Sequence, residues 1–489
     1  MLKKALEKYN AMPVHARASM WYLISSFLQK GISVISTPIF TRLLTTAEYG
    51  RYSVFNSWLG IVTVFVTLRL YYGVFGQGLV KFDERKDQWA SAMIGLTTTL
   101  ISVWLAVYLI GHRFFNRIFE LSTSQMLAMF LMMWTEAMFS FWASRQRVEY
   151  NYRKLVSMTV AVSIAKPLFG VLAVLIFKDS RVTARVWEIA LVELAAYFGL
   201  FFNQMRRGKV FFVRETWKYA LAFNIPLIPH YLSQTVLNTS DRIMIERMVS
   251  SDAAGIYALA YSISLLMTLF NTALRQTIAP WIYQKIKADQ CGDVHWVTYP
   301  ALLFVAAVNL ILMCFAPEVV RLFAPPAYHE AIWVIPPVAM SVYFSFMYYL
   351  FSEFEFYFEK TKFIALSTFI AAAINIVLNF IFIRIFGYYA AGYTTLVSYI
   401  IYAVMHYTFM KRMCVGRISE ERVYDPKILV LYSAVFLAAG FAVALTYRLP
   451  AVRYALIFCI GIAVYIKRKP IMRYLSSNLF NRGRRKQKQ

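Results

Sequence analysis

Apolar runs of roughly 20 residues, separated by short polar segments, recur along almost the whole chain. A helix needs about 20 apolar residues to cross a hydrocarbon core about 30 Å thick, whereas a barrel strand would be about half as long and would alternate. The pattern therefore predicts an all-α polytopic membrane protein with fourteen helical spans. Their predicted ranges are 17–41, 52–76, 89–111, 122–143, 155–177, 186–205, 218–240, 253–277, 296–316, 330–352, 362–383, 388–410, 428–447 and 450–466.

The charged residues lie mainly between these spans and fix their direction. Of the 489 residues, 60% are hydrophobic and only 16% are charged, against about 25% charged in a soluble domain. Most of the 51 Lys and Arg residues fall in the N-terminal segment, in every second loop and in the tail. By the positive-inside rule both termini are cytoplasmic. The net charge of +26 therefore reflects topology and not a nucleic-acid partner.

Three further features limit the classes of function. No loop is long enough to fold as a domain, so function must reside in the helical bundle or at its mouths. The four cysteines, Cys291, Cys314, Cys414 and Cys459, have neither disulfide nor metal-ligand spacing. The first apolar run continues without a small-residue cleavage site, which argues against a cleaved signal peptide. The basic tail 482–488 has the charge to contact anionic lipid headgroups, or it is simply solvated.

An eleven-residue phrase occurs twice, as Arg42–Tyr52 and as Arg247–Tyr257, 205 residues apart. Both copies hold Arg, two aliphatic residues, two hydroxyl residues and Gly-x-Tyr in register. Each joins two apolar stretches, which indicates a hinge used once per half. Because both halves have six spans and start on the cytoplasmic side, they are predicted to be parallel repeats that leave a cavity between them. The predicted divisions are an N-lobe 1–210, a C-lobe 211–412 and an appended pair of spans with the tail, 413–489.

Several charged residues fall within the predicted spans, where a charge costs at least about 2.5 kcal/mol on insertion scales. Such residues face a bundle interior or a watery cavity, and two interpretations stay open. They form a cationic cavity for an anionic headgroup, with carboxylates that balance the cations or accept a coupling proton, or they form ion pairs that pin helices together. The candidate cavity residues are Lys30, Arg69, Lys166 and Arg275, and the candidate carboxylates are Glu136 and Glu193.

The second half differs from the first. Apart from Arg275, which lies one residue from the position that repeats Arg69, its spans offer polar but neutral groups such as Asn375 and Asn379. A separate set of charges lies at the outer ends of spans. These residues are predicted either to form ion pairs that close the outer mouth or to be solvated. They are Arg42, Glu48, Asp241, Arg242 and Arg247.

Stretches from both halves resemble a known family, the polysaccharide-export branch of the multidrug/oligosaccharidyl-lipid/polysaccharide (MOP) exporter superfamily. The stretches that carry the resemblance are Thr37–Gly50, Asn238–Ile245, Ala254–Tyr257, Asn375–Asn379 and Gly387–Gly392. The resemblance implies a flippase of the bacterial cytoplasmic (inner) membrane. Its implied substrate is an undecaprenyl-diphosphate-linked oligosaccharide, the repeat unit of O-antigen, capsule or exopolysaccharide, which crosses to the outer leaflet by alternating access. Implied partners are this lipid, membrane lipids and a downstream polysaccharide polymerase.

Other functions remain as alternatives. Within the superfamily these are a lipid II flippase, which also has fourteen spans, and a cation-coupled drug exporter, which usually has twelve. From another class, a membrane polysaccharide polymerase would need larger loops. No nucleophile motif, metal-ligand spacing or phosphate-binding glycine loop appears, so we expect neither an enzyme nor a cofactor. Whether a proton or sodium gradient drives transport, through Glu136 or Glu193, is left open.

Overall fold

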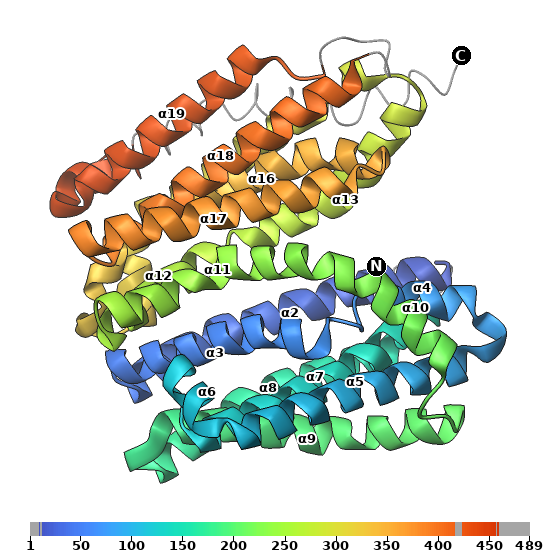
Figure 1. Ribbon diagram of the computed structural model, residues 1–489. Coiled ribbons are helices and arrows are strands. Elements are labelled where there is room, and N and C mark those ends of the chain that lie inside the picture. Colours follow the sequence, from blue (N-terminus) through green and yellow to red (C-terminus); the bar gives the residue numbers. More distant parts are fainter. Residues whose placement is uncertain (1–8, 10–11, 416–422, 456, 459–489) are drawn as a thin grey trace. The chain divides into compact units, whose positions relative to one another are not determined.

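The structure is a computed structural model that describes residues 9, 12–415, 423–455 and 457–458 (Figure 1). Most of the predicted span 450–466, the tail 482–488 and Cys459 lie outside these residues. The described part consists of helices and connecting turns, with no strand in it. The predicted all-α polytopic membrane fold is confirmed, whereas the exact number of fourteen spans stays a prediction.

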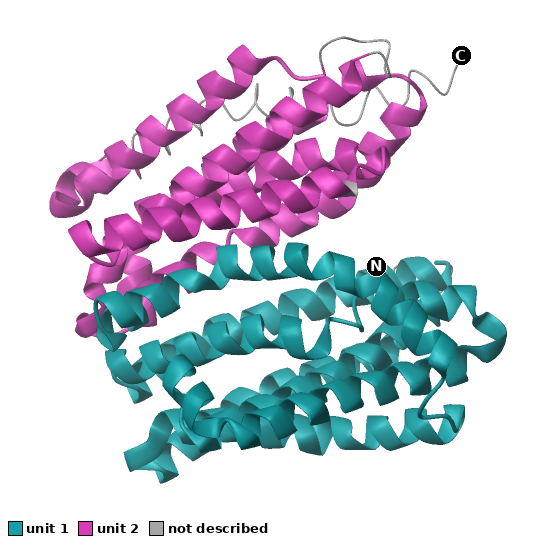
Figure 2. Cartoon of the chain, viewed as in Figure 1, with its two compact units in different colours: residues 1–255 teal, residues 256–489 magenta. Residues whose placement is uncertain are grey.

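The chain divides into two compact units, residues 1–255 and 256–489 (Figure 2). The helices of the first unit run from α2 to α11. They are α2 (Val14–Leu43), α3 (Thr46–Thr67), α4 (Val74–Lys81), α5 (Lys86–Ile110), α6 (His112–Phe119), α7 (Thr123–Val148), α8 (Tyr152–Ile176), α9 (Arg181–Gly208), α10 (Arg214–Asn224) and α11 (Ile228–Met248), with short 3₁₀ turns η1 (Asp83–Arg85), η2 (Lys178–Ser180) and η3 (Ile225–Leu227).

The second unit begins within α12 (Ser251–Leu265). Its remaining elements are α13 (Thr268–Lys287), η4 (Cys291–Asp293), α14 (His295–Cys314), α15 (Ala316–Phe323), η5 (Pro326–Trp333), α16 (Ile335–Tyr357), α17 (Thr361–Phe386), α18 (Tyr389–Cys414), α19 (Pro426–Leu445) and η6 (Thr446–Arg448). The order of elements recurs: a 3₁₀ turn, a long helix and an eight-residue helix occur as η1, α5 and α6 and again as η4, α14 and α15. This recurrence supports the internal repeat.

Nine helical stretches of the described chain are long and apolar enough to cross a membrane, or ten if η5 and α16, which are bent by 48°, count as one span. Helices α3, α11 and α18 have 22, 21 and 26 residues and overlap predicted spans, but they are too polar to satisfy the same test. Polar spans belong in the interior of a bundle, away from lipid. Accordingly α11 packs along α3 and α18 packs against both α16 and α17.

Local sequence explains where two helices of the first unit begin. Helix α3 opens with a capping box, in which the Thr45 hydroxyl accepts from the Glu48 amide and the Glu48 carboxylate accepts from the Thr45 amide. Helix α7 opens with the same arrangement of Ser122 and Gln125. Such boxes satisfy amides that the first helical turn leaves without partners. They fix the start of each helix at one residue.

Two spans that the sequence predicted as continuous are interrupted. The predicted span 52–76 ends as a helix at Thr67, because Leu68 and Arg69 both adopt left-handed backbone conformations, with φ of 50° and 45°. The predicted span 218–240 is interrupted by η3, whose Pro226 has no amide to donate. The two interruptions meet. The Asn224 side-chain amide donates to the Leu68 and Arg69 carbonyls at 2.8 and 3.0 Å.

The boundary between the units differs from the lobe boundary proposed at residue 210. Helices α10 and α11 fall in the first unit because α11 packs on α3 and Asn224 binds the end of that helix. The lobes 1–210 and 211–412, with 413–489 appended, are inferred from the internal sequence repeat, and this division stays a prediction.

Candidate functional site

An ion pair links helices α8 and α9 of the first unit. Lys166 of α8 places its Nζ 2.5 Å from Oε1 of Glu193 on α9. The other carboxylate oxygen, Oε2, accepts a hydrogen bond of 2.8 Å from the hydroxyl of Thr135 on α7. Three helices are therefore tied together through the Glu193 carboxylate, which is only 7% exposed as a residue.

Two further predicted residues join this pair. Glu136 follows Thr135 on α7, and the charges that act on it electrostatically are those of Glu193, Arg69 and Lys166. Its side chain is exposed, although most of the helix that carries it is buried. We call Arg69, Glu136, Lys166 and Glu193 the first-unit charge cluster. The sequence named all four, and the structure shows a direct contact between two of them, Lys166 and Glu193.

Arg69 reaches the cluster from the interruption after α3. Its Nη2 lies 3.4 Å from the hydroxyl of Thr235 on α11, while its Nε is buried without a hydrogen-bond partner among the described residues. The left-handed backbone at Leu68 and Arg69 turns the chain away from the helix axis at this point. The guanidinium thus comes from an interrupted helix, as many ion sites in membrane transporters do.

A second ion pair next to the cluster was missed by the sequence analysis. Arg185 and Glu188 of α9 are both 7% exposed and pair with each other, and Arg185 also donates to the Lys166 carbonyl at 2.9 Å. The guanidinium stacks 4.1 Å from the centroid of the Phe40 ring on α2. Gly170 makes this possible, since a Cβ there would overlap the Arg185 guanidinium. The available signal was the spacing of three between the two charges, which places them on one helix face.

Lys30, the remaining cation predicted in the first half, is not brought into this cluster by any contact. It lies near the middle of α2 with an exposed side chain, and it makes no hydrogen bond or ion pair within the described ranges.

Arg275, the corresponding residue in the second unit, stacks on an aromatic ring. Its guanidinium carbon lies 3.2 Å from the centroid of Tyr349, and its Nη2 lies 3.7 Å from Oε1 of Glu353. The Tyr283 hydroxyl donates to Oε2 of Glu353 at 2.8 Å. In the second unit, an arginine of α13 therefore lies near a carboxylate of α16.

The prediction that the second half holds no deep charges besides Arg275 is wrong. Helix α16 continues to Tyr357, beyond the predicted end at residue 352, so Glu353 and Glu355 are helical and buried. Glu355 pairs with His406 of α18. The asparagines named from the sequence do lie in this unit: Asn375, Asn379 and Thr394 form a buried chain of hydrogen bonds between α17 and α18.

The residues proposed as an outer gate have local partners. Arg42 donates to the Pro38 carbonyl at 2.8 Å, and Arg242 donates to the Asn238 carbonyl at 3.0 Å. Asp241 is fully buried. These three residues lie on helices of the first unit.

The other two gate residues bind residues that the sequence analysis did not name. Glu48 lies 3.5 Å from the guanidinium of Arg181. Arg247 lies 3.4 Å from Glu120 and donates to the Ile118 carbonyl. The gating role of all five residues stays a prediction.

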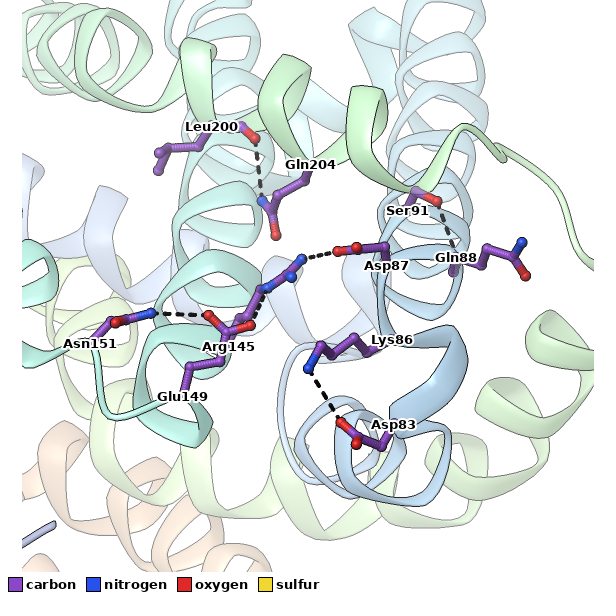
Figure 3. A network of polar contacts seen from close by, with 10 residues as sticks. All are labelled: Asp83, Lys86, Asp87, Gln88, Ser91, Arg145, Glu149, Asn151, Leu200 and Gln204. Atoms are coloured by element: carbon purple, nitrogen blue, oxygen red, sulfur yellow. Dashed lines mark hydrogen bonds and ion pairs between the residues drawn. The ribbon is translucent and has the colours of Figure 1, made fainter. Parts of the chain in front are cut away.

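A further polar network holds α5 to α7 at the ends of these helices (Figure 3). Arg145 of α7 is 5% exposed and binds two carboxylates, Asp87 at 2.5 Å and Glu149 at 2.8 Å. Asn151 donates to the free oxygen of Glu149 at 3.0 Å. By the predicted topology this network lies on the cytoplasmic side.

An apolar groove of about 300 Å³ runs along the second unit between α16, α18 and α19. Its lining includes Phe344 and Phe351 of α16, Val404 of α18 and Leu429 and Leu437 of α19. Helix α19 is the first of the two appended spans that the sequence predicts, and it forms one wall of this groove.

Comparison with known proteins shows where this architecture belongs. Residues 16–286 match the model of the family described as "Polysaccharide biosynthesis protein". Lsg locus putative protein 1 of Haemophilus influenzae is 23% identical over 394 residues, which is 76% of this chain and 92% of that protein. An uncharacterized membrane protein of the same organism is 20% identical over 355 residues, 70% of this chain and 83% of that protein.

Two solved structures share the fold. The lipid II flippase MurJ, in an inward-closed conformation, matches with a TM-score of 0.68 and 15% identity over 92% of this chain and 99% of that chain. An inward-facing multidrug resistance MATE family transporter of the MOP superfamily matches with a TM-score of 0.60 and 12% identity over 80% and 95%. The family match covers more than half of the chain. This protein therefore belongs to the family described as "Polysaccharide biosynthesis protein".

Proposed function

We propose that this protein carries an undecaprenyl-diphosphate-linked oligosaccharide from the cytoplasmic to the outer leaflet of a bacterial cytoplasmic membrane, with both termini cytoplasmic. The observation that supports the proposal is the first-unit charge cluster, which contains two basic side chains, Arg69 and Lys166, in a member of this family. A diphosphate is an anion that lipid cannot solvate, so a protein that moves it needs cations on the way.

The members of the cluster suit different parts of this task. Lys166 is 30% exposed as a side chain although it is paired with Glu193, so it retains an open side for an anion. Arg69 keeps guanidinium donors beyond its bond to Thr235, and a planar guanidinium binds phosphate through two oxygens. Lys30 is exposed without a partner in the described chain, and a lysine in a span is least costly where it faces water.

The lipid part of the substrate needs an apolar surface. The groove between α16, α18 and α19 has an almost wholly apolar lining, which suits an isoprenoid chain. The fold similarity to a lipid II flippase is in keeping with this assignment, and lipid II is the alternative substrate that we retain. A cation-coupled drug exporter is the second alternative, based on the fold similarity to a MATE transporter.

The energy source and the downstream partner belong to the same proposal. Glu136 and Glu193 are the first-unit carboxylates available for proton or sodium coupling, and consumption of the product outside would also drive transport. A polysaccharide polymerase in the outer leaflet is the partner expected to use that product.

Reconstitution into liposomes tests the proposal directly. The purified protein is mixed with a fluorescent undecaprenyl-diphosphate oligosaccharide, and exposure of the glycan to an external probe is followed over time. We expect protein-dependent translocation, with a large loss in Lys30→Ala/Lys166→Ala. Lys178→Ala, an exposed lysine of η2, is the matched control and is expected to retain wild-type rates.

The outcomes separate the alternatives. Translocation that survives in the folded double variant would keep the function but reduce both lysines to structural roles. Failure to move this lipid, together with translocation of lipid II or of a cationic drug under the same conditions, would replace the proposed substrate.

A further inference from the structure

Glu355 of α16 and His406 of α18 form an enclosed pair in the second unit. Nδ1 of His406 lies 2.8 Å from Oε1 and 2.9 Å from Oε2 of Glu355, and both side chains are 0% exposed. Three aromatic rings surround the imidazole, with centroid distances of 4.6 Å for Tyr402, 5.4 Å for Tyr348 and 5.9 Å for Phe363. The pair therefore sits in an aromatic box and not in solvent.

The second ring nitrogen of His406 provides an independent observation. Nε2 is buried and has no hydrogen-bond partner in the part of the chain that the structure describes. Because Nδ1 faces the carboxylate, it carries a proton whenever Glu355 is ionised, and Nε2 is then the atom that gains or loses a proton. With Nε2 deprotonated the pair has a net charge of −1, and with Nε2 protonated it is neutral.

The groups around the pair offer little to neutralise the negative charge of Glu355, so a bound proton is the main way to neutralise it. Glu353, two residues before Glu355, is engaged with Arg275 and Tyr283 of α13. The ionisable side chain in direct contact with Glu355 is His406.

The remaining elements face the pair with groups that carry no fixed charge. Helix α18 presents Tyr402, and α16 presents Tyr348. Helix α17 presents Phe363, and its Thr368 shares a 2.8 Å hydrogen bond with the Tyr402 hydroxyl. An uncompensated negative charge is costly in such surroundings, so the enclosed state favours the protonated, neutral pair.

We propose that Glu355 and His406 form a proton-binding site, and that one proton enters and leaves this site in each transport cycle. The proton comes from water, is held at His406 Nε2 and returns to water, with no covalent bond to carbon or oxygen formed or broken. Since the pair is closed to solvent here, exchange takes place in a state in which α16 and α18 separate at this level. This inference rests on the proposed function and moves the coupling site from Glu136 or Glu193 to the second unit.

The transport test uses the full-length protein in liposomes with the same undecaprenyl-diphosphate oligosaccharide probe. A gradient of one pH unit is a tenfold ratio of proton activity, so one coupled proton per cycle shifts the equilibrium distribution of the probe across the bilayer by about tenfold. We expect this shift in the wild type and its loss in Glu355→Gln. The glutamine still offers an oxygen to Nδ1, so a purely structural hydrogen bond would be kept. His406→Gln is the second variant.

The matched controls are Glu359→Gln and His329→Gln, which change exposed residues and are expected to leave the tenfold shift unchanged. A tenfold shift that persists in folded Glu355→Gln and His406→Gln overturns the inference. Wild-type translocation that ignores the pH gradient overturns it too, while the proposed function stands. Absence of translocation in the wild type would instead count against the proposed function.

A measurement without substrate then decides the proton site by itself. The chain has six histidines, so ¹⁵N NMR of histidine-labelled protein identifies His406 by the signal that His406→Gln lacks. We expect Nε2 of His406 to change protonation state as the pH is varied over the range in which the protein stays folded, and we expect this change to be altered in Glu355→Gln. A single protonation state over the whole range, or a transition that is unaffected by Glu355→Gln, overturns the inference.

Discussion

Gly50 and Gly255, the glycines of the two copies of the repeated phrase, pack against each other. The amide nitrogen of Gly255 lies 2.8 Å from the position that a Cβ on Gly50 would occupy, and that of Gly50 lies 3.1 Å from the corresponding position on Gly255. A Cβ on Gly50 would also overlap the Ser251 carbonyl. The hydroxyl of Thr46 reinforces the contact by donating to the Asp252 carboxylate. The repeat thus marks a crossing of two backbones within the first unit.

This crossing predicts a steric penalty at Gly50. In Gly50→Ala the new methyl group meets backbone atoms, which cannot turn aside, and we expect a loss of about 1–3 kcal/mol in unfolding free energy. Denaturation in detergent by heat or SDS measures it. Gly199→Ala is the control, because no atom lies within 4 Å of its Cβ position. Equal stability of the two variants would show that the crossing opens readily.

Asn224→Ala is predicted to weaken the junction of α3 with α10. It removes both hydrogen bonds to the Leu68 and Arg69 carbonyls, and leaving buried carbonyls unpaired costs about 1–3 kcal/mol. Asn56→Ala is the control, since the Asn56 amide binds only the Tyr52 carbonyl of its own helix. Unfolding by SDS compares the two variants. A larger loss for Asn56→Ala would contradict the assigned role.

Arg145→Met is predicted to loosen the network between α5 and α7. The substitution keeps an unbranched apolar stem but leaves Asp87 and Glu149 without their buried cation. Charged hydrogen bonds contribute about 1.5–3 kcal/mol each before solvent screening. Proteolysis of the α5 and α7 ends, together with thermal unfolding, reports the change. Lys86→Met removes an exposed ion pair with Asp83 and should cost less than about 1 kcal/mol. Similar losses in both variants would argue against a structural role for Arg145.

Asn379→Ala is predicted to separate α17 from α18 more easily. Asn379 receives a hydrogen bond from Thr394 of α18 and donates one to Asn375. Interhelical hydrogen bonds of this kind contribute about 0.6–1.7 kcal/mol in membrane proteins. Asn309→Ala is the matched control, since it is equally buried but binds the Val305 carbonyl of its own helix. If steric trapping or SDS unfolding gave the two variants the same stability, the interhelical hydrogen bonds would contribute no more to stability than a bond within one helix.

The charges that could be located from the sequence are those in the middle of long apolar runs. Lys166, Glu136 and Glu193 each interrupt such a run, and the cost of burying them forces them toward one another. The pair of Glu355 and His406 escaped prediction for the opposite reason. Glu355 lies just beyond the predicted end of its span at residue 352, where a charge is unremarkable, and only the extra turns of α16 bring it opposite His406.

The interruption after α3 also lay beyond sequence analysis. Neither Leu68 nor Arg69 is a residue that favours a left-handed backbone, and the nearest glycine, Gly73, comes four residues later. Tertiary contact fixes this conformation, because Asn224 holds both carbonyls from about 155 residues away in the sequence. The backbone preferences of Leu68 and Arg69 do not depend on such a distant residue, so they cannot predict this conformation.

The distance in sequence between this asparagine and the carbonyls it binds imposes an order on biosynthesis. The Leu68 and Asn224 positions are 156 residues apart. At a synthesis rate of about 5–20 residues per second, α3 waits roughly 8–30 s in the membrane before its end receives a partner. During that interval lipid headgroups, water or an insertion chaperone must donate hydrogen bonds to the exposed carbonyls. The first unit therefore cannot be completed before α10 has been synthesised. A truncated chain that stops after α9 is expected to be a substrate for membrane quality control.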